Sequence, residues 1–289
     1  MRFAKWQGTG NDFVLLEAEG EEPGTGPSGR DWPRLARAIC DRHFGVGADG
    51  LLLVLPSDRA DLRMRIFNPD GSEAEMCGNG IRCFVRHAVE RGLARPQDGR
   101  LRVETGAGVL TAELLDEQGR EGWVRVGMGR PHFAPAEIPV LVELEPPIRN
   151  LSLTVDGQIV SVTCVSMGNP HAVHFYARPV ASYPLEQVGP KVETHPLFPQ
   201  RVNFEVARVL NRELIEARVW ERGAGATLAC GSGASAVVVA AHLHNLVEDR
   251  VEVRLPGGTL LLEWDGEGEV YLSGPAERVF TGEWPDERT

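Results

Sequence analysis

The chain has 289 residues, of which 42% are hydrophobic and 25% charged, and its 41 acidic and 30 basic side chains give a formal net charge of −11. This length predicts two domains of about 100–200 residues each, and the acidic balance argues against a nucleic-acid-binding protein, which usually presents a basic face. The longest apolar run, residues 236–241, is far shorter than the ~20 residues of a membrane helix, the first residues lack an export signal, and five thinly spread cysteines argue against a disulfide framework. We therefore expect a cytoplasmic protein with no membrane or nucleic-acid partner.

The first half of the chain alternates predicted strands with two predicted helices. Residues 32–43 form a helix with Asp31 as its N-cap and Pro33 in its first turn. Residues 78–91 form a second helix, because their apolar side chains recur on one face. Residues 20–29 are predicted to be an exposed loop. Alternation of apolar and polar residues predicts strands at 51–55, 62–67, 101–104, 109–115 and 123–128.

The second half repeats this pattern after a proline-rich stretch. Residues 131–147 contain five prolines and no clear period, and they are the best candidate for a linker. Residues 231–246 are apolar almost all round up to Ala241, which predicts a helix buried inside its own domain. Alternation predicts strands at 151–155, 159–166, 172–176, 202–210 and 214–220.

An internal repeat relates the two halves. Arg65-Ile-Phe-Asn68 resembles Arg218-Val-Trp-Glu221, and a cysteine follows nine residues after each, at Cys77 and Cys230. Each cysteine opens a Cys-Gly-Xaa-Gly turn that leads into a predicted helix. The two cysteines are 153 residues apart, about half the chain. We expect two domains of one topology, facing each other across a cleft.

The two repeated cysteines are the strongest candidates for chemistry. A helix N-terminus can lower a cysteine pKa from ~8.5 to between ~3.5 and 7.5, which yields a thiolate. Two opposed thiols can invert a stereocentre, since one removes the α-proton while the other delivers a proton to the opposite face. The helix N-termini would hold the substrate carboxylate as charge develops on it. The other cysteines, Cys40, Cys83 and Cys164, fall within apolar patterns and are expected to be structural.

No cofactor is expected. The chain has only two lysines, Lys5 and Lys191, and neither lies in a context suited to a pyridoxal phosphate Schiff base. Residues 45–50 match G-x-G-x-x-G, but they follow a helix and precede a strand, the reverse of the dinucleotide-binding order. The histidine spacings give no metal-binding motif, so no metal is predicted. Arg82, Arg86 and Arg91 lie along one predicted helix and are expected to form a solvated face.

The two cysteine segments resemble the signatures of the diaminopimelate epimerase family. Asn68-Pro-Asp-Gly-Ser72 followed by Cys77-Gly-Asn-Gly-Ile-Arg82 is similar to the first signature, and Glu221-Arg-Gly-Ala-Gly225 with Leu228-Ala-Cys-Gly231 to the second. Similar segments are Gly8–Phe13, Gly45–Asp49, Met167–His171 and Arg201–Asn203, so the resemblance runs nearly end to end.

The resemblance implies an α+β fold with two pseudo-symmetric domains. Each would be a curved, mostly antiparallel β-sheet or barrel around a central helix, with the active site in the cleft between them. The N-terminal half would be residues 1–130, completed by 276–289, and the C-terminal half residues 131–275. The family is cofactor-independent and interconverts LL- and meso-diaminopimelate in bacterial lysine and peptidoglycan precursor synthesis. The resemblance also implies a homodimer.

Carried over residue by residue, the resemblance makes Cys77 and Cys230 the acid–base pair, with Glu221 and His171 orienting the α-amino group and the thiols. The reacting carboxylate would be held by backbone N–H groups of Gly78, Asn79, Gly231 and Ser232. The rest of the substrate would be held by Asn11, Asn68, Asn169, Asn203, Arg222 and Glu221. Other interpretations remain open: Asn68 and Asn203 as turn or capping residues, Arg222 in a surface ion pair, and His171 as a core histidine.

Three positions depart from the family pattern. Gly50 stands where some members have a substrate-contacting glutamine, Ala226 where a glutamate is frequent, and Phe280 where some members have a tyrosine at the dimer interface.

Two rival functions also remain. Proline, hydroxyproline or histidine racemases use the same chemistry on another substrate, whereas a non-enzymatic thiol protein would use a reversible disulfide between Cys77 and Cys230 and exchange no α-proton.

Overall fold

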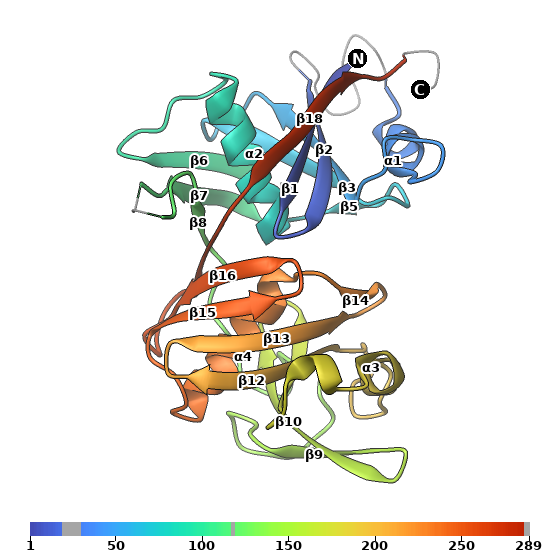
Figure 1. The fold of residues 1–289 in the computed structure, drawn as a ribbon, viewed down its shortest axis with the longest axis vertical. Helices are drawn as coiled ribbons and strands as arrows, with labels where there is room; N and C mark the ends of the chain where they lie inside the picture. The colour runs from blue at the N-terminus through green and yellow to red at the C-terminus, as the bar shows by residue number, and fades with distance from the viewer. Residues whose placement is uncertain (19–29, 117–118, 286–289) are drawn as a thin grey trace. The chain divides into compact units, whose positions relative to one another are not determined.

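A computed structural model describes residues 1–18, 30–116 and 119–285. The predicted loop at 20–29 and the last four residues of the predicted C-terminal segment therefore lie outside the described residues. The chain divides into two compact units, one made of residues 1–126 with 274–289 and the other of residues 127–273. Each unit is described here by itself (Figure 1).

The described residues of the first unit form one sheet in the order β18–β1–β2–β3–β4–β6–β7–β8, with the short β5 paired to β4. Most neighbours are antiparallel, but β2–β3 and β4–β6 are parallel and are joined through helices α1 and α2. The elements are β1 (Arg2–Gly8), β2 (Asn11–Glu17), α1 (Trp32–Cys40), β3 (Gly50–Leu55), β4 (Leu62–Phe67), β5 (Glu73–Ala74), α2 (Gly78–Glu90), β6 (Arg100–Thr105), β7 (Gly108–Leu114), β8 (Val124–Gly127) and β18 (Glu277–Glu283).

The second unit repeats this arrangement in the order β9–β10–β11–β12–β13–β15–β16–β17, with the short β14 paired to β13. Its parallel pairs, β11–β12 and β13–β15, are joined through α3 and α4. The elements are β9 (Leu151–Val155), β10 (Gln158–Ser166), β11 (Pro170–Phe175), the 3-10 turn η1 (Val180–Ser182), α3 (Leu185–Glu193), β12 (Asn203–Asn211), β13 (Leu214–Glu221), β14 (Gly225–Thr227), α4 (Gly231–Leu243), β15 (Arg250–Leu255), β16 (Gly258–Glu263) and β17 (Tyr271–Gly274).

One helix lies at the centre of each sheet. Helix α2 contacts β1, β2, β3, β4, β7 and β18, and α4 contacts β10, β11, β12, β13, β15 and β16. A helix can touch six strands of one sheet only if the sheet curves around it. Both helices accordingly bury most of their residues, and the Ala- and Val-rich run of α4 has no polar face to expose. The predicted two-domain α+β fold, with a curved and mostly antiparallel sheet around each central helix, is confirmed.

The sequence placed most elements to within a few residues and missed others. Helices α1 and α4 each end three residues before their predicted ends. Helix α3 was not predicted, because Gly189 and Pro190 interrupt its pattern. Gly189 is required there, since a Cβ at this position would lie 2.6 Å from the Trp220 ring. Strand β1 pairs with both β2 and β18. Segments near the two ends of the chain therefore lie in one sheet.

The prediction that residues 131–147 form a linker is wrong. The whole stretch lies inside the second unit, and His132 forms a β-bridge with Ser166. Ile138 is completely buried and Val140 is 5% exposed, and both join the core that includes β9, β10 and β12. The prolines prevent regular secondary structure here, but the apolar residues between them still pack against the sheet.

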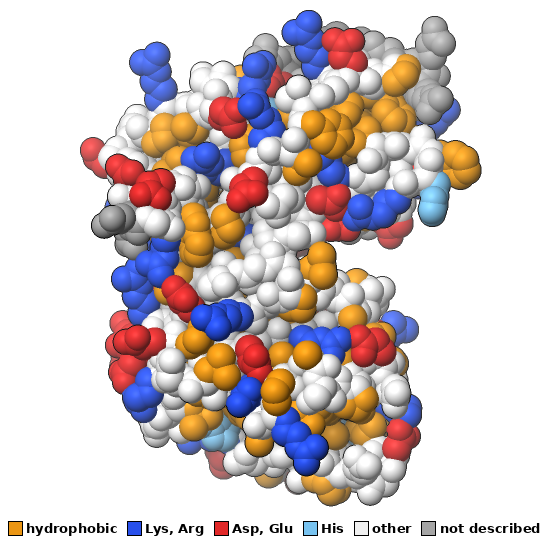
Figure 2. All heavy atoms as spheres, in the orientation of Figure 1, with side chains coloured by type: hydrophobic (Ala, Val, Ile, Leu, Met, Phe, Trp, Pro, Cys, Tyr) orange, Lys and Arg blue, Asp and Glu red, His pale blue; other side chains and the backbone are white. Residues whose placement is uncertain are grey.

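Charged side chains of both signs are interspersed on the visible face of each unit (Figure 2). Within the described residues, no helix is both long and apolar enough to span a membrane.

Candidate active site

Cys77 caps the N-terminus of α2. Its backbone is extended, with φ −144° and ψ 120°, and its sulfur accepts a hydrogen bond from the Gly80 N–H at 3.4 Å. Gly78 is the first residue of the helix. Because the start of a helix carries a partial positive charge, this thiol lies where a negative charge is favoured.

Two asparagines flank Cys77, and the three residues are called here the Cys77 cluster. The Cys77 thiol donates to Asn11 Oδ1 at 3.9 Å, and Asn79 Nδ2 donates to the same oxygen at 3.2 Å. Asn11 Nδ2 in turn donates to Asp49 Oδ2 at 2.7 Å. A carboxylate can only accept, so Asp49 fixes which end of the Asn11 amide faces the cysteine.

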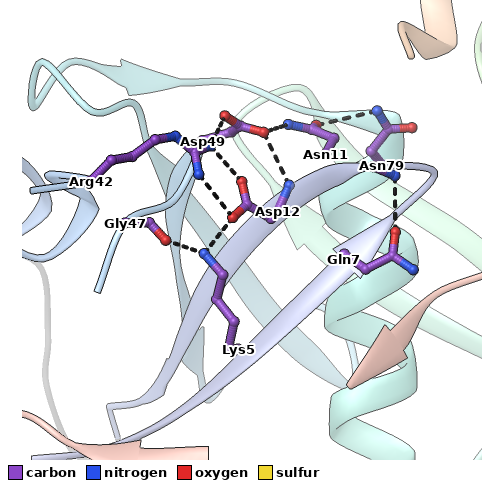
Figure 3. A network of polar contacts seen from close by, with 9 residues as sticks. Lys5, Gln7, Asn11, Asp12, Arg42, Gly47, Asp49 and Asn79 are labelled. Atoms are coloured by element: carbon purple, nitrogen blue, oxygen red, sulfur yellow. Dashed lines mark hydrogen bonds and ion pairs between the residues drawn. The ribbon is translucent and has the colours of Figure 1, made fainter. Parts of the chain in front are cut away.

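Asp49, which contacts Asn11, belongs to a charged network with Arg42, Asp12 and Lys5 (Figure 3). Arg42 Nη2 donates to Asp49 Oδ1 at 2.6 Å and to Asp12 Oδ1 at 2.8 Å, and Lys5 forms an ion pair with Asp12. Burial opposes the charge on Asp12, but the hydrogen bonds from Arg42 and Lys5 outweigh it and lower the pKa of this carboxyl to about 2. Asp12 therefore stays ionised at neutral pH, and Asp49, which shares Arg42 with it, holds Asn11 in place.

Arg82 lies behind the Cys77 cluster and is completely buried. It donates to Gly78 O at 3.1 Å, to Asn79 Oδ1 at 3.0 Å and to Thr9 Oγ1 at 2.8 Å, all uncharged acceptors. Burial lowers the pKa of Arg82 to about 10, so the side chain is still charged at neutral pH. The prediction of a solvated face is thus wrong for Arg82, which stabilises the first turn of α2.

Cys230 caps α4 in nearly the same conformation, with φ −130° and ψ 119°, and accepts a hydrogen bond from the Gly233 N–H at 3.4 Å. Gly231 is the first residue of this helix. The Ser232 hydroxyl lies 3.4 Å from the Cys230 sulfur and accepts a hydrogen bond from Asn169 Nδ2 at 3.3 Å. Both cysteines of the repeat are therefore helix caps, and their local geometry is nearly the same.

The environment of Cys230 opposes ionisation. Burial and the Glu221 carboxylate raise the pKa of this thiol well above its ordinary value, and hydrogen bonds from Ser232 and Gly233 offset this only in part. The expectation that the helix N-terminus lowers the cysteine pKa is therefore wrong for Cys230, because desolvation is the larger effect.

A buried polar pair stands beyond Asn169. His171 on β11 and Glu205 on β12 are both completely buried, and His171 Nδ1 lies 2.7 Å from Glu205 Oε1. The other ring nitrogen, Nε2, lies 2.9 Å from Asn169 Oδ1. We call the series Glu205, His171, Asn169, Ser232 and Cys230 the Glu205 chain. His171 is a core histidine by burial, and this chain also connects it to the cysteine.

The loop after β13 is held against the start of β12. Asn203 Oδ1 accepts from the Arg222 N–H at 2.8 Å, and Asn203 Nδ2 donates to Pro170 O at 2.9 Å. The Arg222 side chain is exposed and donates to Gln200 O at 3.1 Å. Among the described residues it forms no ion pair with a carboxylate. Glu221, the last residue of β13, accepts a hydrogen bond from Thr227 Oγ1 at 2.6 Å.

Asn68 forms hydrogen bonds within its own turn. It lies in the turn after β4, where its Nδ2 donates to Ser72 Oγ at 2.9 Å and its N–H donates to Ser72 O at 2.8 Å. These are turn contacts, as one of the open interpretations predicted. Asn203 likewise has a structural contact, but that contact fixes the backbone of Arg222.

The three departures from the family pattern have separate surroundings. Gly50 begins β3, and a Cβ there would lie 3.1 Å from Phe67 O. Ala226 is exposed on β14, and Phe280 is 46% exposed on β18. The remaining cysteines are buried, and burial raises the pKa of each to about 12: Cys40, Cys83 and Cys164.

Sequence reasoning missed Glu205, Asp49 and Arg82 as neighbours of the cysteines. Glu205 lies between Phe204 and Val206 in a predicted strand. An acidic residue flanked by apolar side chains could have indicated a buried functional carboxyl group. Residues 203–207 of β12 are all buried, so alternation did not apply to them. Asp49 and Arg82 act through contacts with residues distant in the chain, which spacing does not reveal.

Comparison with known proteins shows which family the chain belongs to. The family model described as diaminopimelate epimerase matches residues 3–134 and 163–279. The chain is 52% identical over 287 residues to proteins from Moorella thermoacetica and from Pelotomaculum thermopropionicum, and covers 99% of its own length and of theirs. Both relatives are named diaminopimelate epimerase.

Solved structures show the same fold at low sequence identity. A Bacillus anthracis phenazine biosynthesis protein of the PhzF family gives a TM-score of 0.70 at 18% identity, with 99% of both chains covered. A probable proline racemase from Agrobacterium radiobacter gives 0.69 at 16% identity, with 99% of this chain and 93% of that chain covered. On the family match and the close relatives, the chain belongs to the diaminopimelate epimerase family and is an epimerase, an enzyme of the isomerase class.

Proposed function

We propose that this protein interconverts LL-2,6-diaminopimelate and meso-diaminopimelate with Cys77 and Cys230 as its acid and base, in bacterial lysine and peptidoglycan precursor synthesis. The observation that carries the proposal is the repeated placement of a cysteine at the N-cap of each central helix. The names of relatives about 50% identical over the whole chain support the substrate.

The reaction balances with the two thiols alone. One sulfur, as the thiolate, takes the α-proton, and the other, as the thiol, gives its proton to the opposite face of the same carbon. The enzyme ends with the proton on the other cysteine, and the reverse reaction exchanges the roles. Negative charge that develops on the substrate carboxylate is stabilised by the N-termini of α2 and α4, where Gly78 and Gly231 begin the helices. This mechanism uses no cofactor.

Glu221 links substrate binding to the ionisation of Cys230. Burial raises the pKa of Cys230 most, and the Glu221 carboxylate raises it further. The α-ammonium group of the substrate, bound beside Glu221, neutralises this carboxylate and removes its effect on the sulfur. Loss of this contribution makes the Cys230 thiolate easier to form when the substrate is bound.

Arg222 is assigned to the distal carboxylate of the substrate. Its backbone is held by Asn203, and its exposed guanidinium has only a carbonyl acceptor among the described residues. An arginine can bind a carboxylate through two parallel hydrogen bonds. A long substrate with an amino-acid group at its far end is therefore favoured over proline, which has no distal charge.

Replacing Arg222 with alanine is expected to raise KM for diaminopimelate by about 10- to 100-fold, since hydrogen bonds to charged groups contribute ~1.5–3 kcal/mol. The initial rate of epimerisation at increasing substrate concentration measures this. Exchange of a short amino acid, if any is turned over, is expected to change far less. Arg212→Ala, which removes another exposed arginine of the same unit, is the control. Equal losses for the long and the short substrate would contradict the distal role.

We further propose that the two compact units are the two epimerase halves, and that the enzyme is a cytoplasmic homodimer. The exposed Phe280 on β18, at a position where some family members have an interface tyrosine, supports a dimer contact through this strand. Two catalytic thiols also suit a reducing compartment. Light scattering of the reduced protein measures the mass in solution, and a monomeric mass would contradict the dimer.

The function is tested by proton NMR of LL-diaminopimelate with the reduced protein in heavy water. Appearance of the meso form, with solvent deuterium at one α-carbon, is the expected result. An absence of exchange, with the thiols verified as free, would overturn the proposal. The same measurement on proline, hydroxyproline and histidine then tests the racemase alternatives. An absence of α-proton exchange with all of these substrates would favour a non-enzymatic thiol protein.

A further inference from the structure

Glu205 is a buried carboxyl group that the two-thiol mechanism does not use. It is completely buried on β12, and within the described residues its Oε2 has no hydrogen-bond partner. Its Oε1 lies against the first turn of α4, where a Cβ at Gly233 would come within 3.0 Å of it. An acidic group in this position is costly to bury, so a specific contact must account for it. That contact is His171.

The hydrogen bonds of the Glu205 chain have a defined direction. Asn169 Nδ2 donates to Ser232 Oγ, so Asn169 Oδ1 is the atom that faces His171 Nε2. An amide oxygen only accepts, and His171 Nε2 must therefore carry a proton. Since Ser232 Oγ already accepts from Asn169, its own proton is available for the Cys230 sulfur at 3.4 Å.

The same direction sets the proton content of the Glu205–His171 pair. With Nε2 protonated, the 2.7 Å contact between Nδ1 and Oε1 also contains a proton, on one atom or the other. The pair is then neutral overall, either as a neutral acid with a neutral imidazole or as a carboxylate with an imidazolium. Burial raises the pKa of Glu205, which supports the form in which Glu205 holds the proton and donates it to Nδ1.

We propose that Glu205 is a positioning residue that acts through His171, Asn169 and Ser232 to direct a hydroxyl donor at the Cys230 sulfur. The inference rests on the proposed role of Cys230 as acid and base. Cys230 is buried and faces the Glu221 carboxylate, so its thiolate needs donors when it forms. Gly233 supplies one and Ser232 the other, and Glu205 keeps the second one correctly oriented.

The ionisable groups around Glu205 make an opposite hypothesis testable. His171 faces it from β11, Glu221 from β13 and Cys230 from α4. If Glu205 were a carboxylate beside a neutral His171, its negative charge would oppose the Cys230 thiolate. Removing Glu205 would then make Cys230 more reactive, whereas loss of a positioning residue makes it less reactive. The two hypotheses predict changes of opposite sign.

The experiment measures iodoacetamide alkylation of Cys230 and Cys77 separately, by peptide mass spectrometry on the full-length reduced protein between pH 6 and 10. Glu205→Leu removes the donor to His171, and we expect Cys230 to react about tenfold more slowly at pH 8, with its pH profile moved to higher pH. Glu205→Gln keeps an N–H donor for Nδ1, and we expect Cys230 to react within about twofold of the unmodified protein. Cys77 is expected to be unchanged in both variants.

Ser232→Ala tests the last step of the Glu205 chain without altering the buried pair, and it is expected to slow Cys230 to a similar extent. Ser235→Ala is its control, since this hydroxyl on the same helix donates to Gly231 O at 2.9 Å and not to the sulfur. Faster alkylation of Cys230 in Glu205→Leu, or equal slowing of both cysteines, would overturn the proposal. No substrate is used, so the assay remains informative even if the unmodified protein fails to epimerise diaminopimelate.

Discussion

Replacing either Cys77 or Cys230 with serine is expected to lower the rate of epimerisation by about 10²–10⁴-fold, the usual contribution of a general acid or base. An alcohol is a far weaker acid than a thiol, so serine neither forms the base at neutral pH nor returns the proton efficiently. The fold is expected to survive, because each cysteine is a helix cap that accepts from the N–H of Gly80 or Gly233, and serine is a strong N-cap residue.

The two single variants separate the two halves of the mechanism. Proton NMR in heavy water measures epimerisation, and a substrate analogue with a good leaving group reports whether the remaining thiolate still removes an α-proton from its own side. We expect each variant to lose epimerisation and to retain slow one-sided elimination. Cys83→Ala is the control, since Cys83 is a buried cysteine of α2 that does not cap the helix. Full epimerisation by either serine variant would remove the two-base assignment.

Local sequence patterns were sufficient to place both cysteines. The Cys-Gly-Xaa-Gly turns, each followed by a helix, required only neighbouring residues to be read correctly. The repeat then implied that the two halves share one topology, and the matching strand orders of the two units confirm this. A feature encoded within a few residues, and present twice, is therefore accessible from the sequence.

The residues that support the Cys77 cluster, Asp49 and Arg82, could not be predicted in this way. Asp49 contacts Asn11 because β3 pairs with β2, and Arg82 contacts Thr9 because α2 packs on β1. Such contacts depend on pairings between distant segments, which spacing along the chain does not specify. Arg82 also illustrates a limit of charge patterning, since an arginine on a helix is usually solvated and this one is completely buried.

The repeat also conceals a chemical difference between the two cysteines. Asn11 and Asn169 occupy equivalent places, but Asn11 presents its amide oxygen to Cys77, whereas Asn169 presents its amide nitrogen to Ser232 beside Cys230. Asp49 fixes the first orientation, and in the second the Asn169 amide oxygen faces His171 Nε2. Symmetry of the fold therefore does not imply symmetry of the hydrogen bonds. The substrate has two different faces at its α-carbon, and two unlike cysteines are compatible with that.

Replacing Asp12 with asparagine is expected to lower the free energy of unfolding by about 3 kcal/mol, the lower end of the cost of breaking a buried ion pair. Lys5 is only 5% exposed and would lose its anionic partner, so that it is left with uncharged acceptors such as the Gly47 carbonyl. Urea unfolding at pH 7 measures the loss. Lys5→Met combined with Asp12→Leu is expected to recover most of it, because the buried charge is then absent.

Arg42→Ala is the matched control, since it removes the more exposed partner of the same carboxylate and is expected to cost less than about 1 kcal/mol. The pH dependence gives a second readout. The pKa of Asp12 is depressed from 3.8 to about 2, so its contribution is complete above the unfolded value and is lost as pH falls toward 2. The unmodified protein should therefore lose stability between pH 5 and 2 more steeply than Asp12→Asn. Parallel curves, with a small loss at pH 7, would show that this charged network contributes little to folding.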